Sequence, residues 1–254
     1  MHIYAQSNQY GDLLGLDMEA RETPSLPDRG VVLTGTYCRL EPLDADKHVA
    51  DLFEGYQLDT TGQLWTYIPN GPYASQAELQ AWAESAQTKP DPFFYAIIDL
   101  KTNKAVGIAS YLRIDPVSHS IEVGWITYTP LMQRSPISTE AMYLMMKQAF
   151  DMGYRRYEWK CNALNAPSIS AAMRLGMTFE GLFRQMGMPK GQNRDTAWFA
   201  IIDKDWPVAQ AAFEKWLSPD NFDADGTQKT ALSDLTAPIV HDRWPTLTVK
   251  VVKE

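Results

Sequence analysis

The chain has 254 residues, of which 45% are hydrophobic and 21% are charged. This length predicts one full domain with appendages, and the ordinary composition excludes a disordered, collagen-like or coiled-coil protein. The 31 acidic residues outnumber the 23 basic ones, so the formal net charge of −8 argues against a nucleic-acid partner.

The sequence carries no sign of a membrane or metal partner. No apolar run approaches the roughly 18 residues that a membrane span needs, and the first residues lack the charged and apolar regions of a signal peptide. Cys38 and Cys161 are far apart with no CxxC pair, and the four histidines are scattered. We therefore expect a cytoplasmic protein with reduced cysteines, no bound metal and no membrane partner.

The periodicity of apolar residues predicts a mixed α/β domain at residues 31–206, after an N-terminal arm at 1–30 and before a C-terminal extension at 207–254. The expected strands cover residues 31–43, 93–100, 105–115, 120–130, 155–163, 177–183 and 196–206. The expected helices cover residues 44–56, 139–152 and 165–175, and another begins at Ser75, which has capping-box spacing to Glu78.

The extension is predicted to contain a helix at residues 208–217, a polar stretch at 218–236 and a last strand at 246–252. That strand has no obvious partner in the sequence. It can pair within the chain or with a second copy in a homodimer, and the sequence leaves both alternatives open.

Five segments of the domain are informative as an ordered set: GTYCRLEPLDADKHVADLF, IEVGWITYTPLMQ, TEAMYLMMKQAF, NAPSISAAMRLGMTFEGLFRQ and GQNRDTAWFAIIDKDW. Together they resemble the GNAT superfamily of N-acetyltransferases, and within it the branch of the ribosomal-protein N-terminal alanine acetyltransferases. The resemblance implies a mixed, mostly antiparallel sheet that is flanked by helices and splayed between its fourth and fifth strands. It also implies acetyl-CoA as the acetyl donor.

The resemblance implies two groups of cofactor contacts. The backbone of Ile126, Thr127 and Tyr128 would face the pantetheine arm. The pyrophosphate would meet the next loop, at Gln133, Arg134, Ser135, Ile137, Ser138 and Thr139. The N-terminus of a helix favours an anion there on physical grounds as well.

The phosphate loop departs from the family pattern Q/R-x-x-G-x-G/A, because Pro136 and Ser138 occupy its glycine positions. Proline has no N–H, so one donor is lost. A GNAT-like module that binds CoA or a partner protein without turnover is therefore the alternative to an enzyme.

Asn165 and Ser168 match the N-x-x-S motif of that branch, in which the asparagine contacts the pantetheine and the serine is a candidate general acid for the leaving thiolate. The structural alternative is that Asn165 only caps its helix, with Ser168 as the third helical residue. Both roles are compatible.

An alkylamine acceptor is protonated at neutral pH, so a base within hydrogen-bond reach assists the reaction. Glu122 is the first candidate, on the strand face opposite Val123. The alternative is a solvated or salt-bridged strand residue. Glu158 and His119 are the further candidates.

The resemblance implies an acceptor cleft between the loop that joins the first two helices and the turn before the last domain strand. The loop contains Trp65, Tyr67 and Tyr73, and the turn contains Lys190 and Arg194. The aromatic side chains can close over an amine or pack the loop onto the sheet. We expect direct acetyl transfer to a primary amine, with a small molecule favoured over a peptide N-terminus as acceptor.

Overall fold

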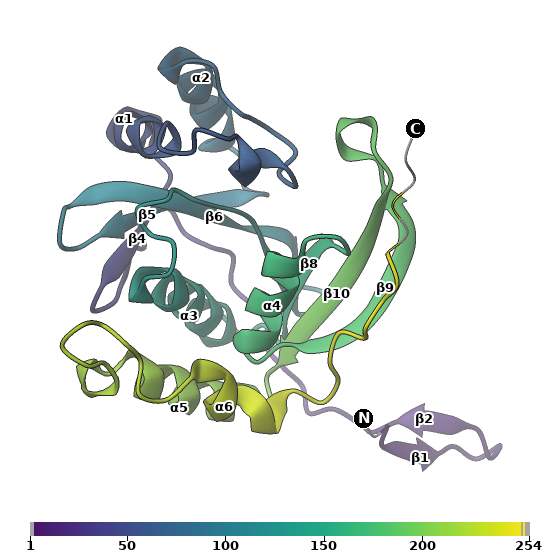
Figure 1. The fold of residues 1–254 in the computed structure, drawn as a ribbon. Coiled ribbons are helices and arrows are strands. Elements are labelled where there is room, and N and C mark those ends of the chain that lie inside the picture. Colours follow the sequence, from purple (N-terminus) through teal and green to yellow (C-terminus); the bar gives the residue numbers. More distant parts are fainter. Residues whose placement is uncertain (1–2, 250, 252–254) are drawn as a thin grey trace.

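The computed structural model describes residues 3–249 and 251. Its centre is an eight-stranded sheet in the order β3-β4-β5-β6-β7-β8-β10-β9, with helices on both faces (Figure 1). Within the described residues every neighbouring pair is antiparallel except β7 and β8, which are parallel. The predicted mixed, mostly antiparallel sheet is confirmed. The strands of this sheet are β3 (Leu33–Thr34), β4 (Cys38–Pro42), β5 (Phe93–Asp99), β6 (Lys104–Asp115), β7 (Ser120–Tyr128), β8 (Arg156–Asn162), β9 (Thr178–Gly187) and β10 (Arg194–Ile202).

Two hydrophobic cores lie on opposite faces of the sheet. One core joins the first two helices to β5 and β6, and the other joins the remaining domain helices and the C-terminal extension to the opposite face. Figure 1 shows the first helix pair above the sheet and the others below it. The helices are α1 (Ala45–Tyr56), α2 (Gln76–Ala86), α3 (Pro136–Asp151), α4 (Ala166–Arg174), α5 (Trp206–Leu217) and α6 (Leu232–Thr236). None of these helices, or any other in the described residues, has the length and hydrophobicity to cross a membrane.

The capping box predicted for α2 is present with one change, because the return bond to Glu78 comes from Ala74, the residue before the N-cap. The Ser75 hydroxyl accepts the N–H of Glu78, and the Glu78 carboxylate accepts the N–H of Ala74 at 2.9 Å. Helix α3 begins at Pro136, three residues before the expected start, because proline is well suited to the first turn of a helix.

The chain ends differ from the sequence-based expectation. A separate hairpin of β1 (Ala5–Ser7) and β2 (Leu13–Gly15) lies outside the main sheet (Figure 1). The predicted last strand is wrong for residues 246–249 and 251, which have no strand structure, and residues 250 and 252 lie outside the described residues. Alternation of apolar residues does not make a strand unless a neighbour supplies the hydrogen bonds.

The sheet opens between β7 and β8. Among the described residues these strands pair only at Ser120–Val123 with Arg156–Trp159. Just beyond, β7 has one more residue than β6 between paired positions, and Trp125 in this bulge has a φ of 51°. A bulge bends its strand, so the ends of β7 and β8 diverge as the fourth and fifth domain strands were expected to do.

The buried Glu140 on α3 holds the chain ahead of β4. Its two carboxylate oxygens accept the N–H groups of Thr36, Tyr37 and Cys38 at 2.6–2.7 Å. A side chain at Gly35 would collide with this carboxylate, which fills the space where a Cβ would lie. Glu140 thus satisfies three backbone donors that no strand partner can reach.

We expect Glu140→Gln to lower the free energy of unfolding by about 3 kcal/mol, because the new amide places a donor against N–H groups and leaves them unsatisfied. The melting temperature should fall by about 10 °C. Glu54→Gln is the matched control, since Glu54 pairs with Lys104 on the exposed surface, where an ion pair contributes little. Equal melting temperatures for the two variants would contradict this role of Glu140.

Candidate active site

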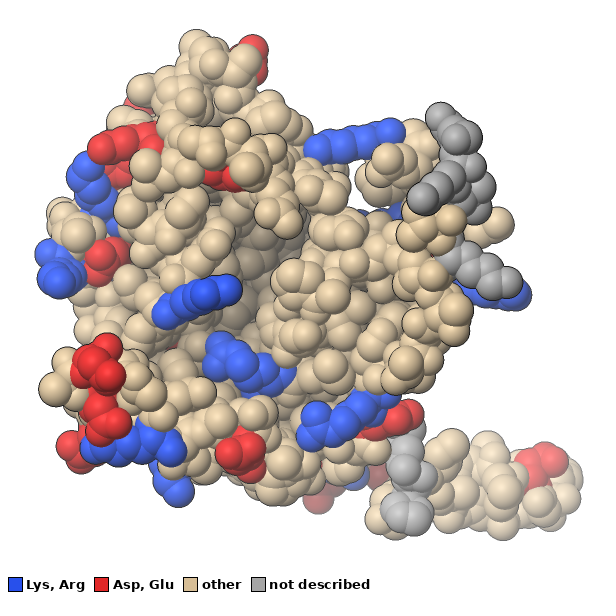
Figure 2. Space-filling model, in the orientation of Figure 1, with Lys and Arg blue, Asp and Glu red and all other residues tan. Residues whose placement is uncertain are grey.

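A large cleft passes through the opening between β7 and β8. It has a volume of about 1830 Å³ and extends from the α1–α2 loop, past the first turns of α3 and α4, to the C-terminal extension. Figure 2 shows the hollow at the centre of this face, with Lys and Arg side chains in and beside it. A typical small-molecule pocket has about 300–1,000 Å³, so this cleft has room for a long ligand and a second substrate.

The N-terminus of α3 faces this cleft with free backbone donors. Ser135 is the N-cap, but its hydroxyl donates to the carbonyl of Met132 at 2.7 Å and does not cap the helix. The N–H groups of Ser135, Ile137 and Ser138 consequently have no acceptor among the described residues. The N-cap side chains of α1, α2 and α4 accept backbone N–H groups, whereas those of α5 and α6, like that of α3, do not. Unpaired N–H groups at the start of a helix, together with the helix dipole, favour an anion on physical grounds.

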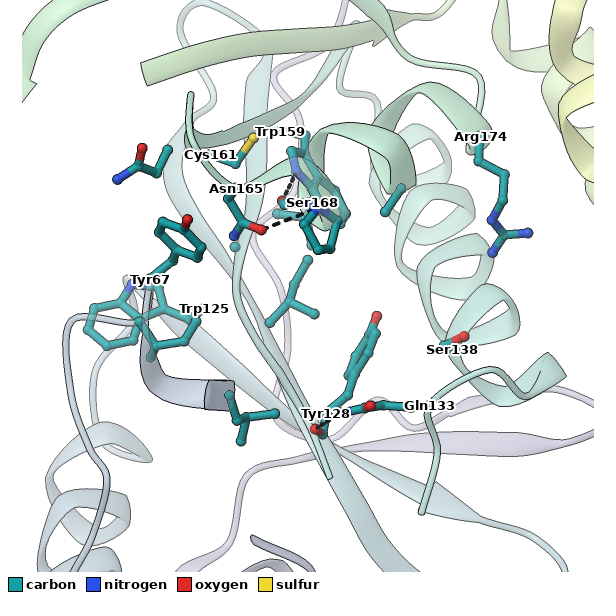
Figure 3. A pocket seen from close by; sticks show the side chains of 18 of the residues that line it. Tyr67, Trp125, Tyr128, Gln133, Ser138, Trp159, Cys161, Asn165, Ser168 and Arg174 are labelled. Atoms are coloured by element: carbon teal, nitrogen blue, oxygen red, sulfur yellow. Dashed lines mark hydrogen bonds between the residues drawn. The ribbon is translucent and has the colours of Figure 1, made fainter. Parts of the chain in front are cut away.

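Two arginines add positive charge near this helix start. Arg174 extends from α4 toward Ser138 (Figure 3), and its Nη2 donates to the Thr139 hydroxyl at 2.6 Å. Arg134 lines the cleft in a left-handed conformation, with a φ of 58°. Pro136 occupies the first helical position, where an N–H takes no part in the helix, so the remaining donors are intact.

The predicted cofactor contacts divide into residues that line the cleft and residues that do not. Ile126 and Tyr128 line the cleft beside the opening, and the Tyr128 hydroxyl is buried without a hydrogen-bond partner among the described residues. Gln133 also lines the cleft, and its side-chain amide donates to the carbonyl of Tyr128 at 3.3 Å. Thr127 and Ile137 are absent from the lining formed by the described residues. Thr127 is buried, and the Ile137 side chain packs against the core.

Asn165 and Ser168 lie together at the start of α4 (Figure 3). The Asn165 Oδ1 accepts the N–H of Ser168 at 3.2 Å, so the capping role is present. The indole N–H of Trp159 donates to the Ser168 hydroxyl at 3.0 Å, which leaves the hydroxyl proton free for another acceptor. The neighbouring Cys161 stays a thiol at neutral pH, because burial raises its pKa to about 11.

Glu122 is buried at the opening and is held by two cations. Arg113 Nη1 lies 2.7 Å from each of its oxygens, and Lys160 Nζ lies 2.8 Å from Oε2. A carboxylate has about four lone-pair sites, so one site remains for a water or an amine. Glu122 also lines the cleft, which places it within reach of a ligand there.

The other candidate bases lie outside the lining that the described residues form. Glu158 contacts the same Lys160 at 2.7 Å and also Arg156 at 2.6 Å. Burial raises the pKa of Glu158, but the hydrogen bonds from these two cations outweigh burial and hold it below its usual value. His119 lies in the β6–β7 turn, near the carbonyl of Gly153.

The aromatic side chains of the loop between α1 and α2 mainly pack against their neighbours in the core. Trp65 contacts Tyr56 and Tyr73 edge to face, with ring centroids 4.9 and 5.4 Å apart. Neither Trp65 nor Tyr73 belongs to the cleft lining among the described residues. Tyr67 does line the cleft, and its hydroxyl donates to the carbonyl of Leu164 at 2.9 Å.

The α1–α2 loop is also joined to the β9–β10 turn. Lys190 Nζ donates to the carbonyls of Trp65 and Gly71 at 3.0 and 3.2 Å. Together with the hydrogen bond from Tyr67 to Leu164, these contacts connect the α1–α2 loop to the segments on the other side of the cleft. We call this set of contacts the bridge.

Sequence reasoning missed Arg174, Trp159 and Lys160 as site residues. The spacing of Ser168, Ala171 and Arg174 by three positions puts them on one helical face, which could have located Arg174. Alternation along β8 likewise places Lys160 beside Glu158.

Comparisons with known proteins agree with this geometry. The sequence profile of the acetyltransferase (GNAT) domain family matches residues 38–178, more than half of the chain. The uncharacterized N-acetyltransferase YnaD of Bacillus subtilis (strain 168) is 30% identical over 153 residues, which are 59% of this chain and 87% of YnaD. The crystal structure of a GCN5-related N-acetyltransferase from Brucella melitensis is 44% identical with a TM-score of 0.82, over 85% of this chain and 98% of that chain.

A structure of RimL, a ribosomal L7/L12 alpha-N-protein acetyltransferase in complex with coenzyme A, is 22% identical with a TM-score of 0.58. The match covers 68% of this chain and 98% of that chain, and at this identity it bears on the fold alone. The family match and the relatives of at least 30% identity agree with the opening between β7 and β8 and with the uncapped start of α3. The chain belongs to the GNAT family and is an acetyl-CoA-dependent N-acetyltransferase.

Proposed function

We propose that the protein transfers an acetyl group from acetyl-CoA directly to the primary amine of a small molecule. The observation that carries the proposal is the start of α3, where the free N–H groups of Ser135, Ile137 and Ser138 meet Arg174 beside the opening of the sheet. Such a site suits a pyrophosphate, because donors and positive charge converge on it. The proposal also assigns the cleft along Ile126 and Tyr128 to the pantetheine arm.

Acetyl-CoA supplies the acetyl group as a thioester. In the proposed mechanism the amine attacks the thioester carbonyl, the C–S bond breaks, and Ser168 donates its hydroxyl proton to the leaving sulfur. Ser168 then regains a proton from solvent. The indole N–H of Trp159 supports this role, because it occupies the hydroxyl oxygen as an acceptor and leaves the proton to be donated.

Glu122 is proposed to take the proton that the amine must lose, either directly or through one water. Its free lone-pair site and its place in the cleft lining support this role. Arg113 and Lys160 fix the carboxylate in position and keep it paired while the cleft is empty.

A small acceptor is favoured because the bridge narrows the approach to the cleft. Lys190 ties the β9–β10 turn to the α1–α2 loop, and Tyr67 ties that loop to Leu164. A slender amine can pass such a mouth more easily than the surface of a folded protein.

The first experiment measures the melting temperature with acetyl-CoA, CoA or ATP. A ligand at 100 times its dissociation constant stabilises a protein by about 2.7 kcal/mol, which is readily measured. We expect a shift with both CoA compounds and none with ATP. Release of free CoA thiol should then be faster with small amines than with peptides. Thiol release with peptides alone would overturn the acceptor class, and binding without any thiol release would overturn turnover.

A further inference from the structure

Arg194 is a cation of the cleft without an acidic partner among the described residues. It lies at the start of β10 and lines the cleft, and its Nε is buried with no hydrogen-bond partner among the described residues. No described carboxylate lies within ion-pair distance of its guanidinium. A buried donor without an acceptor costs free energy, so its retention calls for a ligand that supplies the acceptor.

The other charges on this side of the cleft are balanced. Arg113 and Lys160 both pair with Glu122, and Lys160 pairs with Glu158 as well. The indole N–H of Trp198, which also lines the cleft, is a second buried donor without a partner in the described residues. An acceptor group entering here therefore meets unsatisfied donors and a positive charge.

The position of Arg194 separates it from the phosphate site. Thr196, two residues further along β10, pairs with Asn162 at the end of β8. Arg194 also lies close enough to Cys161 for its charge to lower the pKa of that thiol, against the larger effect of burial. Arg194 thus adjoins the reacting end of the cleft near Ser168, whereas Arg134 and Arg174 adjoin the start of α3.

We propose that Arg194 binds the carboxylate of the acceptor, so that the substrate is an amine that also carries a carboxylate, such as a free amino acid. The planar guanidinium can hold a carboxylate through two parallel hydrogen bonds, and the buried setting strengthens them. This inference rests on the proposed function, since it names the acceptor of the same site. It excludes a protein N-terminus, whose neighbouring carbonyl is a neutral amide.

The test compares acids with their amides as ligands of the CoA-loaded protein. Calorimetry with each of the twenty amino acids and its primary amide gives a ratio of dissociation constants that needs no turnover. We expect at least one acid to bind at least tenfold more tightly than its amide. Arg194→Gln should reduce this ratio to about one. Arg194→Lys should preserve part of it, because the positive charge remains but the planar pair of donors is lost.

Arg184→Gln is the matched control, because Arg184 is an exposed arginine on the adjacent β9 that lies outside the cleft lining of the described residues. Its acid-to-amide ratio should equal that of the unaltered protein. The inference is overturned if no acid binds more tightly than its amide, or if the preference survives Arg194→Gln. It is also overturned if Arg194→Gln slows turnover with the ratio unchanged, as expected for an arginine that acts on the leaving thiolate.

Failure of the proposed function gives a different result. The titrations are repeated without CoA, so the ratio is obtained whether or not CoA binds. An acid preference that depends on Arg194, in a protein that neither binds CoA nor releases its thiol, would contradict the transferase and uphold the carboxylate site. Melting temperatures of all three variants show whether each is folded.

Discussion

Replacing Ser168 with alanine is expected to lower kcat for acetyl transfer about a hundredfold, the usual contribution of a positioned proton donor. Because Trp159 Nε1 already donates to the Ser168 oxygen at 3.0 Å, the hydroxyl proton is left for another acceptor. Without the Ser168 hydroxyl, the sulfur must leave as a thiolate that receives no proton from this side chain. The dissociation constant for CoA should change less than threefold, since the backbone N–H that Asn165 accepts is unaffected.

The controls for Ser168 come from the same helix and from the same hydrogen bond. Ser170→Ala removes an exposed hydroxyl of α4 outside the cleft lining of the described residues, and should leave kcat unchanged. Trp159→Phe removes the N–H that donates to Ser168 together with part of a buried ring, so a smaller decrease in kcat is expected along with a lower melting temperature. If Ser168→Ala kept its kcat, Ser168 would be only a helix residue.

Local patterns were sufficient to predict most elements of the domain, but not the hairpin of β1 and β2 or the short helix α6. Apolar periodicity located the helices from α1 to α5 and the strands from β4 to β10, and the spacing of Ser75 and Glu78 located the start of α2. These features depend on neighbours within a few positions, which a single sequence displays. Residues 246–249 alternate as a strand does, yet they lack a strand partner and remain irregular. Pairing depends on distant chain, which alternation alone does not reveal.

The site was predictable only where its residues are close in sequence. Asn165 and Ser168 share one helical turn; their position indicated the helix cap, and their match to the N-x-x-S motif implied the cofactor contact. The environments of Trp65 and Lys190 depend on a contact between residues 125 positions apart. The packing role of Trp65 and the bridge therefore became visible only in the folded chain.

The charges around Glu122 depend on three different strands. Arg113 comes from β6 and Lys160 from β8, and each reaches the carboxylate across the sheet. The sequence identified a candidate carboxylate but not the cations that fix it. It likewise gave no sign that Glu158, which pairs with the same Lys160, is absent from the cleft lining formed by the described residues.

Replacing Glu122 with glutamine is expected to change the pH dependence of the reaction. A neutral amide cannot accept the amine proton, so the variant relies on acceptor molecules that are already neutral in solution. An alkylamine has a pKa of about 10, so this fraction falls about tenfold for each unit of pH below that value. We expect kcat/KM to be about a hundredfold below that of the unaltered protein at pH near 6.5, and less than tenfold below it at pH near 9.5.

Glu158→Gln is the matched control for Glu122→Gln, because each variant removes one of the two carboxylates that hold Lys160 and leaves the other in place. Loss of one partner of a buried ion pair destabilises the fold in both cases, so similar decreases in melting temperature are expected. Only the Glu122 variant should lose activity more strongly at low pH, since Glu122 lines the cleft and Glu158 does not appear in the lining formed by the described residues. Parallel pH profiles for the two variants would assign Glu122 to the support of Lys160, and a loss confined to Glu158→Gln would make Glu158 the base.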